Sequence, residues 1–252
     1  MQVGLIGAGN MARALARGWG DPVLCADPVA ERAAALAADL GGEALPSNRE
    51  VAARADLVLL CHKPAQLEEV AEEIRGDVKV VVSILGGRSL ADVEAAYPGL
   101  PAVRLMPNTA VEVGRGVICY APGSRVDAEL GERLLELLRR LGVVIPIEDR
   151  LIDAATGING VAPAYVALIV EAWSDAGVKA GLPADVATRM SVESARGALE
   201  LLRARGEDTL AVRRAVTSPG GITARGLAAL ERAGLRAAFV DAMDAVIDRR
   251  GS

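Results

Sequence analysis

The chain has 252 residues, of which 52% are hydrophobic and 24% charged, as is ordinary for a globular protein with a buried core. Its formal net charge of −5 does not indicate a nucleic-acid partner. His62 is the only histidine, which excludes multi-histidine metal sites, and Cys25, Cys61 and Cys119 lack metal-ligand spacing. We therefore expect no metal, no nucleic acid, and three free thiols in apolar surroundings.

No segment has the pattern of a secretion signal or a membrane span. Gly7 and Gly9 interrupt the first apolar run, which no basic segment precedes. The longest uncharged stretch, Ala154–Val170, contains Gly157 and Pro163 and is too short and broken to cross a bilayer. We expect a soluble, cytoplasmic protein with no membrane partner.

Short apolar runs and helical patterns alternate through the first half of the chain. The predicted strands are Gln2–Ile6, Pro22–Ala26, Leu57–Cys61, Lys79–Ile84, Ala102–Met106, Val117–Tyr120 and Val143–Pro146. The predicted helices between the early strands are Met11–Trp19, Ala30–Leu40, Ala65–Ile74 and Leu90–Ala96. Because the strand runs are continuously apolar rather than alternating, the pattern predicts a doubly wound α/β fold with a parallel sheet.

The second half shows helical patterns alone. The predicted helices are Leu151–Ala155, Ala164–Ala180, Pro183–Arg205, Leu210–Ala215, Thr223–Ala233 and Arg236–Arg249. The helix that follows Pro163 is apolar nearly all round, so it should be buried on most sides, which in a helical region of about 100 residues favours a partner subunit. We predict two domains, residues 1–149 for nucleotide binding and residues 150–252 for dimerisation and substrate.

A glycine-rich motif follows the first predicted strand and opens the first predicted helix. It reads Gly7-Ala8-Gly9-Asn10-Met11-Ala12 and fits the pattern G-x-G-x-x-G/A of a Rossmann dinucleotide site. The first glycine permits the tight turn, and the second lets the backbone approach a pyrophosphate. The anion then faces free amides at the positive end of the helix. A purely structural glycine turn is the alternative interpretation.

An acidic residue, Asp27, ends the second predicted strand, twenty positions after the first glycine. A carboxylate there can accept both ribose hydroxyls of NAD and repels the 2′-phosphate of NADP, which favours NADH. A helix cap ahead of Pro28 is the alternative, and Arg32 would still offer a positive charge to NADPH.

Further clusters lie just past predicted strand ends, where open α/β sheets bind ligands. They are His62-Lys63-Pro64, Ser83–Gly87 and Met106-Pro107-Asn108-Thr109. In the helical half, Ser218 is a good N-cap, Pro219 can enter a first turn, and Gly220 and Gly221 expose backbone amides ahead of Thr223. Such a loop can hold a carboxylate, although a capped helix start without ligand has the same pattern.

Taken together, the motifs resemble those of the pyrroline-5-carboxylate reductase family over essentially the whole chain. That family reads like IGAGNMA, VKP, RxMPNT, SGSGPAY, DAGVxxGL and SPGGTT, in this order. The counterparts here are Ile6–Ala12, His62–Pro64, Arg104–Thr109, Asn159–Tyr165, Asp175–Leu182 and Ser218–Thr223.

The resemblance implies reduction of the cyclic imine 1-pyrroline-5-carboxylate to L-proline by NADH or NADPH. Ser218-Pro219-Gly220-Gly221 would bind the substrate carboxylate, and the Thr223 hydroxyl would reach the imine nitrogen as the catalytic group. His62, Lys63, Pro64 and Asn108 would lie on the cofactor side, or serve only their own loops. The resemblance also implies a homodimer or larger homo-oligomer whose sites form between two chains.

Three departures from the family pattern keep alternatives open. Asn159 and Val161 replace two serines, Ala110 replaces the proline after MPNT, and His62 replaces a small aliphatic residue. Another imine is therefore an alternative substrate, and a non-catalytic NAD(P)-binding paralogue an alternative role. A β-hydroxyacid dehydrogenase is disfavoured because residues 151–178, where its catalytic lysine would lie, contain no lysine.

Overall fold

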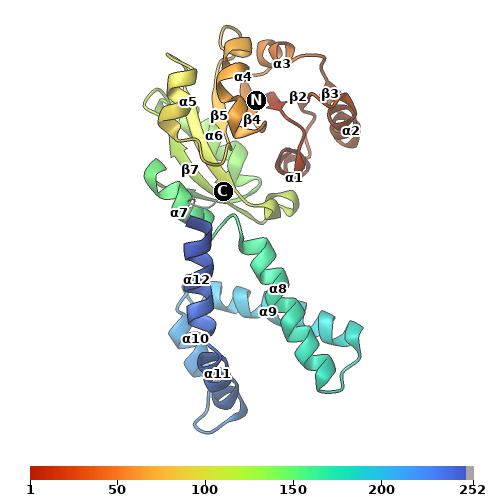
Figure 1. Cartoon of the computed structure of the whole chain (residues 1–252), viewed down its shortest axis with the longest axis vertical. Helices are drawn as coiled ribbons and strands as arrows, with labels where there is room; N and C mark the ends of the chain where they lie inside the picture. Colours follow the sequence, from red (N-terminus) through yellow and green to blue (C-terminus); the bar gives the residue numbers. More distant parts are fainter. Residues whose placement is uncertain (248–252) are drawn as a thin grey trace. The chain divides into compact units, whose positions relative to one another are not determined.

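A computed structural model describes residues 1–247 as two compact units, residues 1–161 and residues 162–247 (Figure 1). The division falls between Val161 and Ala162, whereas the sequence pattern placed a boundary at 149/150. The segment between these two positions belongs to the first unit.

The first unit is built on one sheet. Its described strands are β1 (Val3–Ile6), β2 (Leu24–Ala26), β3 (Glu43–Ala44), β4 (Leu57–Leu60), β5 (Val81–Ser83), β6 (Ala102–Pro107), β7 (Gly116–Pro122) and β8 (Gly142–Pro146). They lie in the order β3-β2-β1-β4-β5-β6-β7-β8. All neighbours are parallel except β6 and β7, which are antiparallel. This is the predicted α/β sheet, with an antiparallel pair and a short β3 that the sequence pattern did not reveal.

Helices cover both faces of this sheet. They are α1 (Asn10–Trp19), α2 (Ala30–Leu40), α3 (Asn48–Arg54), α4 (Leu67–Ile74), α5 (Leu90–Ala96), α6 (Ala128–Arg139) and α7 (Ile152–Thr156), with 3-10 turns η1 (Pro64–Gln66), η2 (Thr109–Val113) and η3 (Asp149–Leu151). Side chains of α1, α2 and α6 build one apolar cluster on the sheet, and those of α3, α4 and α5 build another. The fold is therefore doubly wound, as predicted.

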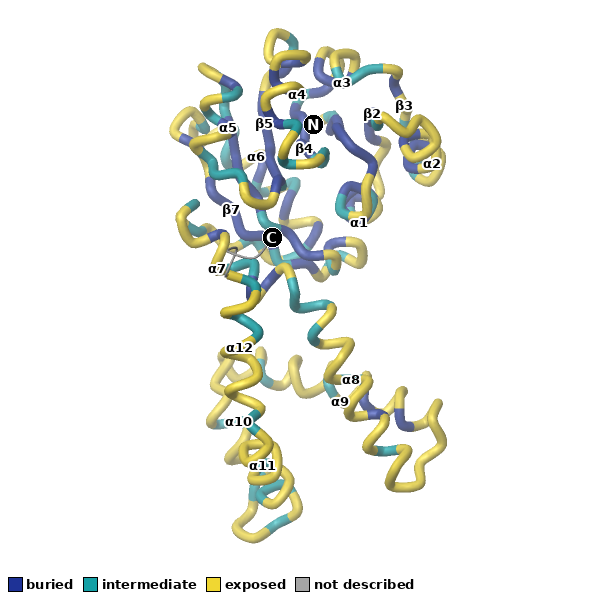
Figure 2. The backbone as a smooth tube through the Cα atoms, viewed as in Figure 1, coloured by how far each residue is buried: buried dark blue, intermediate teal, exposed yellow. Residues whose placement is uncertain are grey.

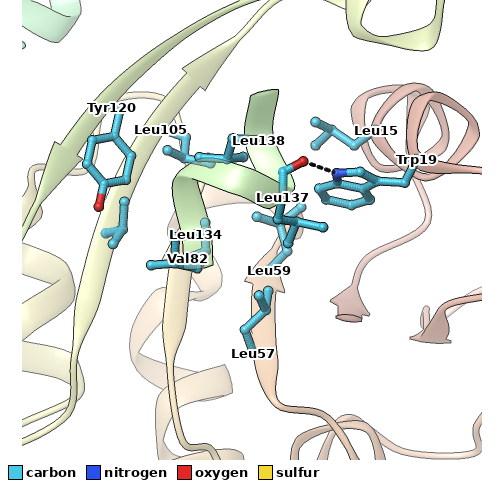
Figure 3. A pocket seen from close by; sticks show the side chains of 11 residues that line it. Leu15, Trp19, Leu57, Leu59, Val82, Leu105, Tyr120, Leu134, Leu137 and Leu138 are labelled. Atoms are coloured by element: carbon cyan, nitrogen blue, oxygen red, sulfur yellow. Dashed lines mark hydrogen bonds between the residues drawn. The ribbon is translucent and has the colours of Figure 1, made fainter. Parts of the chain in front are cut away.

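The core under α1 and α6 is closely packed (Figure 3). Leu15, Leu59 and Leu138 meet there around a residual cavity of about 10 Å³. The indole Nε1 of Trp19 donates to the carbonyl of Leu137 over 3.1 Å, so the polar atom of this large side chain is satisfied. This packing fixes α1, which carries the glycine-rich turn at its N-terminus.

The second unit contains helices alone within its described residues. They are α8 (Ala162–Lys179), α9 (Ala184–Ala204), α10 (Thr209–Ala215), α11 (Ile222–Arg232) and α12 (Leu235–Ile247). The predicted helices agree within two residues at each end, except that residues 248 and 249 of the last one lie outside the described part. α8 packs on α9, and the rings of Tyr165 and Phe239 meet edge to face at 6.4 Å.

This helical unit buries very little of its own surface (Figure 2). Among its described residues, just Ser174, Ala187 and Ser191 are buried. Large apolar side chains such as Leu168 and Val240 are 63% and 59% exposed. A single copy of these helices therefore lacks an apolar core of its own. Within residues 1–247, no helix combines the length and the apolar character needed to cross a membrane.

Candidate active site

The parallel strands of the first unit end at one level. Ile6 of β1 is paired with both Ala26 of β2 and Leu60 of β4, Leu60 with Ser83 of β5, and Ser83 with Arg104 of β6. The chain order reverses at β1, with β2 on one side and β4 on the other. In doubly wound sheets ligands bind beyond the carboxyl ends of the strands at such a switch point. The segments that follow these strand ends are therefore the candidate site.

Gly7 is the first residue beyond β1 and is required by the backbone. Its φ is +99°, and a Cβ built on it would lie 2.6 Å from the carbonyl oxygen of Cys61 and 2.9 Å from the amide nitrogen of His62. Its own amide donates to the carbonyl of Ala26 over 2.8 Å. A side chain would be strained and would push β1 away from the segment after β4.

Gly9 differs, because nothing in the protein demands a glycine there. Its φ of −74° and ψ of −175° suit any residue, and a Cβ would meet no atom within 4 Å. It is the N-cap of α1, which has no side-chain cap and no acidic residue in its first turn. The first amides of α1, from Asn10 and Met11, therefore lack an intrahelical partner. This arrangement fits a pyrophosphate, which needs both close backbone approach and free N–H groups.

Asp27 stands at the tip of β2 and braces the glycine turn. Its Oδ2 accepts from the amide of Ala8 over 2.8 Å, and its Oδ1 accepts from the amide of Val29 over 2.8 Å. The second bond closes the turn ahead of α2. The N-cap of α2 is Val29 and no side chain caps it, so Asp27 is not the helix cap of the alternative interpretation. An ionised carboxylate offers about four acceptor positions, so it retains capacity for ribose hydroxyls. Arg32 makes no side-chain hydrogen bond or ion pair with any residue between 1 and 247.

His62, Lys63 and Pro64 form the turn after β4. His62 Nδ1 lies 2.9 Å from the carbonyl of Lys63, so this nitrogen carries the proton, because a carbonyl only accepts. Its Nε2 is buried without a hydrogen-bond partner among the described residues. Burial lowers the pKa of His62 below its ordinary value, against smaller opposing effects of the Lys63 carbonyl and Glu69. The imidazole is therefore neutral at pH 7.

The turn after β4 is held from its outer side by Arg88. The Arg88 Nε donates to the carbonyl of Pro64 over 2.9 Å, and its two terminal nitrogens hold Glu68 at 2.9 and 3.1 Å. Lys63 is exposed, with its side chain unpaired within the described part of the chain. Arg88 was not among the predicted site residues. The one feature of the sequence that indicates it is its position directly after Gly86-Gly87, just past a predicted strand.

Asn108, just beyond β6, is buried and bonded within the protein. Its Nδ2 donates to Oδ1 of Asn159 over 2.9 Å, and its Oδ1 accepts from the amide of Val117 over 3.3 Å. Asn159 in turn donates to the carbonyls of Met106 and Val117 over 2.7 and 3.1 Å. Asn159 therefore points toward β6 and β7. The sequence pattern showed it as a lost serine, without indicating this pairing.

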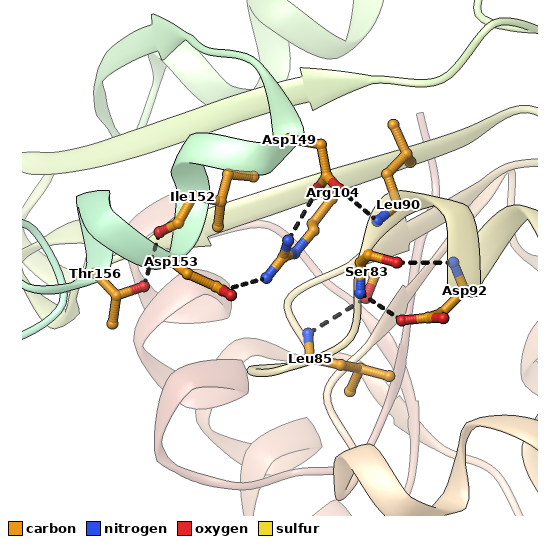
Figure 4. A network of polar contacts seen from close by, with 10 residues as sticks. Ser83, Leu85, Leu90, Asp92, Arg104, Asp149, Ile152, Asp153 and Thr156 are labelled. Carbon is orange, nitrogen blue, oxygen red and sulfur yellow. Dashed lines mark hydrogen bonds and ion pairs between the residues drawn. The ribbon is translucent and has the colours of Figure 1, made fainter. Parts of the chain in front are cut away.

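A buried ion-pair network lies beside this segment (Figure 4). Arg104, only 5% exposed, donates to Asp149 over 2.9 Å and to Asp153 over 3.0 Å. Asp149 also accepts from the amide of Leu90 at the start of α5 over 3.1 Å. The guanidinium thus joins β6 to η3 and α7, two elements that follow the last strand. Breaking such a buried pair from one side is costly, so Arg104 is a structural residue of the RxMPNT motif.

Residues Ser218 to Thr223 form the turn into α11 in the helical unit. The N-cap is Gly221 rather than the predicted Ser218, and α11 begins at Ile222. The hydroxyl of Ser218 instead covers Gly221, where an added Cβ would lie 2.4 Å from Ser218 Oγ. Gly220 turns the chain with φ +69°. Pro219 and Gly220 close a tight turn before the helix starts, since the amide of Gly221 donates to the carbonyl of Ser218, and the N-cap is therefore shifted to Gly221.

The N-terminus of α11 has the properties of an anion site. It has no side-chain cap and no acidic residue in its first turn. Thr223 is the second helical residue, is half-buried, and has no hydroxyl partner among the described residues. Free backbone amides beside an unengaged hydroxyl suit a small carboxylate that carries a neighbouring nitrogen.

The predicted residues thus fall into two groups. Gly7–Met11, Asp27, His62–Pro64 and Asn108 all lie at the carboxyl edge of the sheet in the first unit. Ser218–Thr223 form one turn in the second unit. No group of three or more potential metal-ligating side chains occurs in residues 1–247.

A doubly wound sheet with this glycine turn, followed by a separate helical unit, defines an NAD(P)-dependent oxidoreductase. Residues 2–87 match the family model described as NADP oxidoreductase coenzyme F420-dependent, and residues 149–252 match pyrroline-5-carboxylate reductase dimerisation.

Individual relatives show which family of NAD(P)-dependent oxidoreductases this chain resembles. Pyrroline-5-carboxylate reductase of Synechocystis sp. is 34% identical over 99% of this chain and 97% of that protein. The Streptococcus pyogenes 1-pyrroline-5-carboxylate reductase structure has a TM-score of 0.90 and 30% identity, covering 99% and 97% of the two chains. The Plasmodium falciparum pyrroline carboxylate reductase structure, with NADP bound, has a TM-score of 0.89 and 27% identity, covering 99% and 96%. The chain belongs to the pyrroline-5-carboxylate reductase family.

Proposed function

We propose that this protein reduces 1-pyrroline-5-carboxylate to L-proline at the expense of NADH or NADPH, the last step of a proline biosynthesis. The observation that carries the proposal is the uncapped N-terminus of α11 with its free amides and the unengaged hydroxyl of Thr223. It offers a carboxylate site and a hydrogen-bonding group side by side, as a cyclic imino acid requires. The relatives with this name, at full length, support the same substrate.

The protein contributes binding and orientation on the cofactor side. The amides at Gly9, Asn10 and Met11 would hold the pyrophosphate. The positive end of the α1 helix dipole would attract its negative charge. Asp27 accepts from the adenosine ribose with the lone pairs that Ala8 and Val29 leave free. When bound, NAD(P)H supplies a hydride from nicotinamide C4, so the protein needs no redox group of its own.

On the substrate side, the turn before α11 holds the imino acid. The backbone amides after Gly220 donate to the carboxylate, and the Thr223 hydroxyl hydrogen-bonds the ring nitrogen. The hydride forms a new C–H bond at the C=N carbon, the C=N π electrons move to nitrogen, and a proton on that nitrogen completes the secondary amine. Because such an imine is readily protonated to the iminium near neutral pH, the site needs no strong acid.

The departure at position 159 does not point to another substrate. The side-chain amide of Asn159 is hydrogen-bonded to Asn108, Met106 and Val117, which all belong to the first unit. Its side chain therefore replaces a serine without adding a polar group to a substrate site. This observation supports pyrroline-5-carboxylate over a different imine.

We further propose a preference for NADH, because a negative charge at Asp27 opposes a ribose 2′-phosphate. We also propose that the helical unit, residues 150–252 by sequence, forms a homodimer or larger homo-oligomer. The exposed apolar side chains of α8 to α12 support this, since they need a second copy to cover them.

One assay tests the reaction directly. Purified protein is mixed with pyrroline-5-carboxylate and either cofactor, and the loss of absorbance at 340 nm is followed together with proline formation. We expect stoichiometric proline and NAD(P)H consumption. Nucleotide binding without turnover on this or other cyclic imino acids would instead assign a non-catalytic role.

A further inference from the structure

Asn159 is the most heavily bonded buried amide among the described residues, and no part of the proposed reaction uses it. It is 7% exposed and its partner Asn108 is 6% exposed. Its backbone amide donates to Ala155 over 2.7 Å, which ties it to α7. Its side chain reaches across to β6 and β7 through residues 53 and 42 positions away in sequence. One residue thus joins three separate segments, α7 through its backbone and β6 and β7 through its side chain.

The partners fix the orientation of both amides. Met106 and Val117 present carbonyl oxygens to Asn159, and a carbonyl can only accept, so Nδ2 of Asn159 faces them. Oδ1 of Asn159 must then face Asn108, which has to present its own Nδ2. Consequently Oδ1 of Asn108 faces the amide of Val117. Neither amide can be flipped without setting like atoms against each other.

The segment that Asn159 holds projects beyond the strand ends. β5 ends at Ser83, which pairs with Arg104, but β6 continues to Pro107 before the turn at Asn108. The turn therefore stands past the level at which β1, β4 and β5 end. Gly160 lets the chain close tightly after α7, since a Cβ there would lie 3.2 Å from the Thr156 carbonyl oxygen.

We infer that Asn159 is a positioning residue for the nicotinamide half of the cofactor. It holds the Met106–Thr109 turn in place and sets which atoms Asn108 presents there. One hydrogen on Nδ2 and one lone pair on Oδ1 of Asn108 remain for an amide-like ligand group, and nicotinamide carries a carboxamide of that kind. This role rests on the dinucleotide binding of the proposed function. It would make Asn159, which replaces a serine of the family pattern, a residue that acts on cofactor binding.

The test compares two ligands that differ in the nicotinamide. NADH and ADP-ribose share the adenosine, the pyrophosphate and the second ribose, and their dissociation constants are measured on wild type, Asn159→Ser and Asn108→Ala. We expect each variant to weaken NADH about tenfold, as for one or two lost hydrogen bonds, and ADP-ribose less than twofold. Because Asn159 acts through Asn108, the double variant should lose no more than about either single one.

Controls separate this role from loss of structure. Asp127→Ala removes the N-cap of α6, where Asp127 accepts from Leu130 over 2.8 Å, and lowers stability away from the strand ends. It should leave the ratio of the two dissociation constants unchanged. If Asn159→Ser does not fold, Asn108→Ala alone carries the comparison.

Equal weakening of NADH and ADP-ribose, or of neither, overturns the inference. Turnover is scored separately. A wild type that shows the expected binding ratios and no activity on pyrroline-5-carboxylate contradicts the proposed substrate but not the role of Asn159. A wild type that turns over while the variants keep normal NADH selectivity contradicts the role of Asn159 alone.

Discussion

The carboxylate of Asp27 accepts a hydrogen bond from the backbone amide of Ala8 over 2.8 Å, and so joins the tip of β2 to the glycine turn. The same carboxylate holds Val29. An experiment on cofactor preference therefore has to remove its charge and disturb these two hydrogen bonds as little as it can. Asn does this better than Ser, because it keeps the shape of the side chain and one of the two acceptor oxygens.

We predict that Asp27→Asn raises kcat/KM for NADPH relative to NADH by about ten- to a hundredfold. A carboxylate beside a phosphate costs on the order of one to a few kcal/mol at an effective dielectric near 20. Asp27→Ser should lower the melting temperature more than Asp27→Asn does, because both backbone amides lose their acceptor rather than one. If wild type already prefers NADPH by tenfold, Asp27 acts only as a brace for its two turns.

Gly7 and Gly9 allow a matched pair of alanine substitutions. Gly7→Ala places a Cβ against Cys61 at φ +99° and should lower the free energy of unfolding by more than about 2 kcal/mol. Gly9→Ala places the same methyl group in open space at an ordinary φ and should cost about 1 kcal/mol or less. It should nevertheless weaken NADH at least about tenfold, because the methyl group occupies the approach of the pyrophosphate.

Chemical denaturation and a fluorescence titration with NADH check this pair. A Gly9→Ala protein that binds NADH like wild type would show that the open space before α1 is not the pyrophosphate site.

The main elements of the fold were predictable because their signals are local. Val3–Ile6 and Leu57–Leu60 are continuously apolar, and the helices of the second unit end at glycine or proline punctuation. α6 was not predicted although Asp127 caps it, because charged residues are interspersed among its leucines and it contains a glycine. β3 has two exposed residues and no apolar signal, so only its pairing with β2 reveals it.

The sequence predicted where the site residues lie along the fold, but not which residues they contact. The sequence placed Asn108 and Asp27 beyond strand ends, where they lie. It could not reveal that Asn108 is paired with Asn159, since 51 residues separate them and the pairing depends on how α7 returns to β6. The direction of β7 was hidden for a similar reason, because an antiparallel strand that is covered on both faces looks like a parallel one in sequence.

His62 makes a pH-dependent contribution to stability with a defined sign. Burial lowers its pKa in the folded state below the ordinary value of 6.5, so the unfolded chain binds more protons as the pH falls. Stability therefore rises with pH through this window and is lost as the pH drops below about 6.5. Because His62 is the only histidine and ordinary carboxyl groups titrate lower, the interval from pH 7 to 5 mainly reports this residue.

We predict that His62→Val, which installs the aliphatic type found in the family pattern, flattens the stability profile between pH 7 and 5. Urea denaturation at each pH measures the effect. A variant as pH-dependent as wild type would place the source of any acid sensitivity elsewhere.

The helical unit should be stable only in an oligomer. Leu168 and Trp173 on α8 are 63% and 52% exposed, and an open groove of about 720 Å³ runs between α8 and α9. We predict that Leu168→Glu raises the dissociation constant of the oligomer at least about tenfold or unfolds the unit, since a charge would enter a buried contact. Arg133→Glu, on the exposed side of α6, is the control. Light scattering that finds wild type monomeric at micromolar concentration contradicts the assembly.

Thr223 gives the sharpest test of the chemistry. It is the second residue of α11, and its hydroxyl makes no bond to any residue between 1 and 247. If that hydroxyl binds the imine nitrogen, Thr223→Ala should lower kcat/KM for pyrroline-5-carboxylate by about five- to thirtyfold, the effect of one lost hydrogen bond of about 1 to 2 kcal/mol. The dissociation constant of NADH should stay nearly unchanged.

Three further variants separate bonding from shape. Thr223→Ser keeps the hydroxyl and should retain most activity, whereas Thr223→Val keeps the shape and should be as slow as Thr223→Ala. Thr217→Ala makes the same chemical change in the same loop, but its hydroxyl already donates to the carbonyl of Arg213 over 2.6 Å, so turnover should survive. Full activity in Thr223→Val would make Thr223 a packing residue at a helix start. Loss of NADH binding in all the Thr223 variants would instead assign this loop to the nucleotide, because a group that bonds only the imine cannot affect a cofactor bound in its absence.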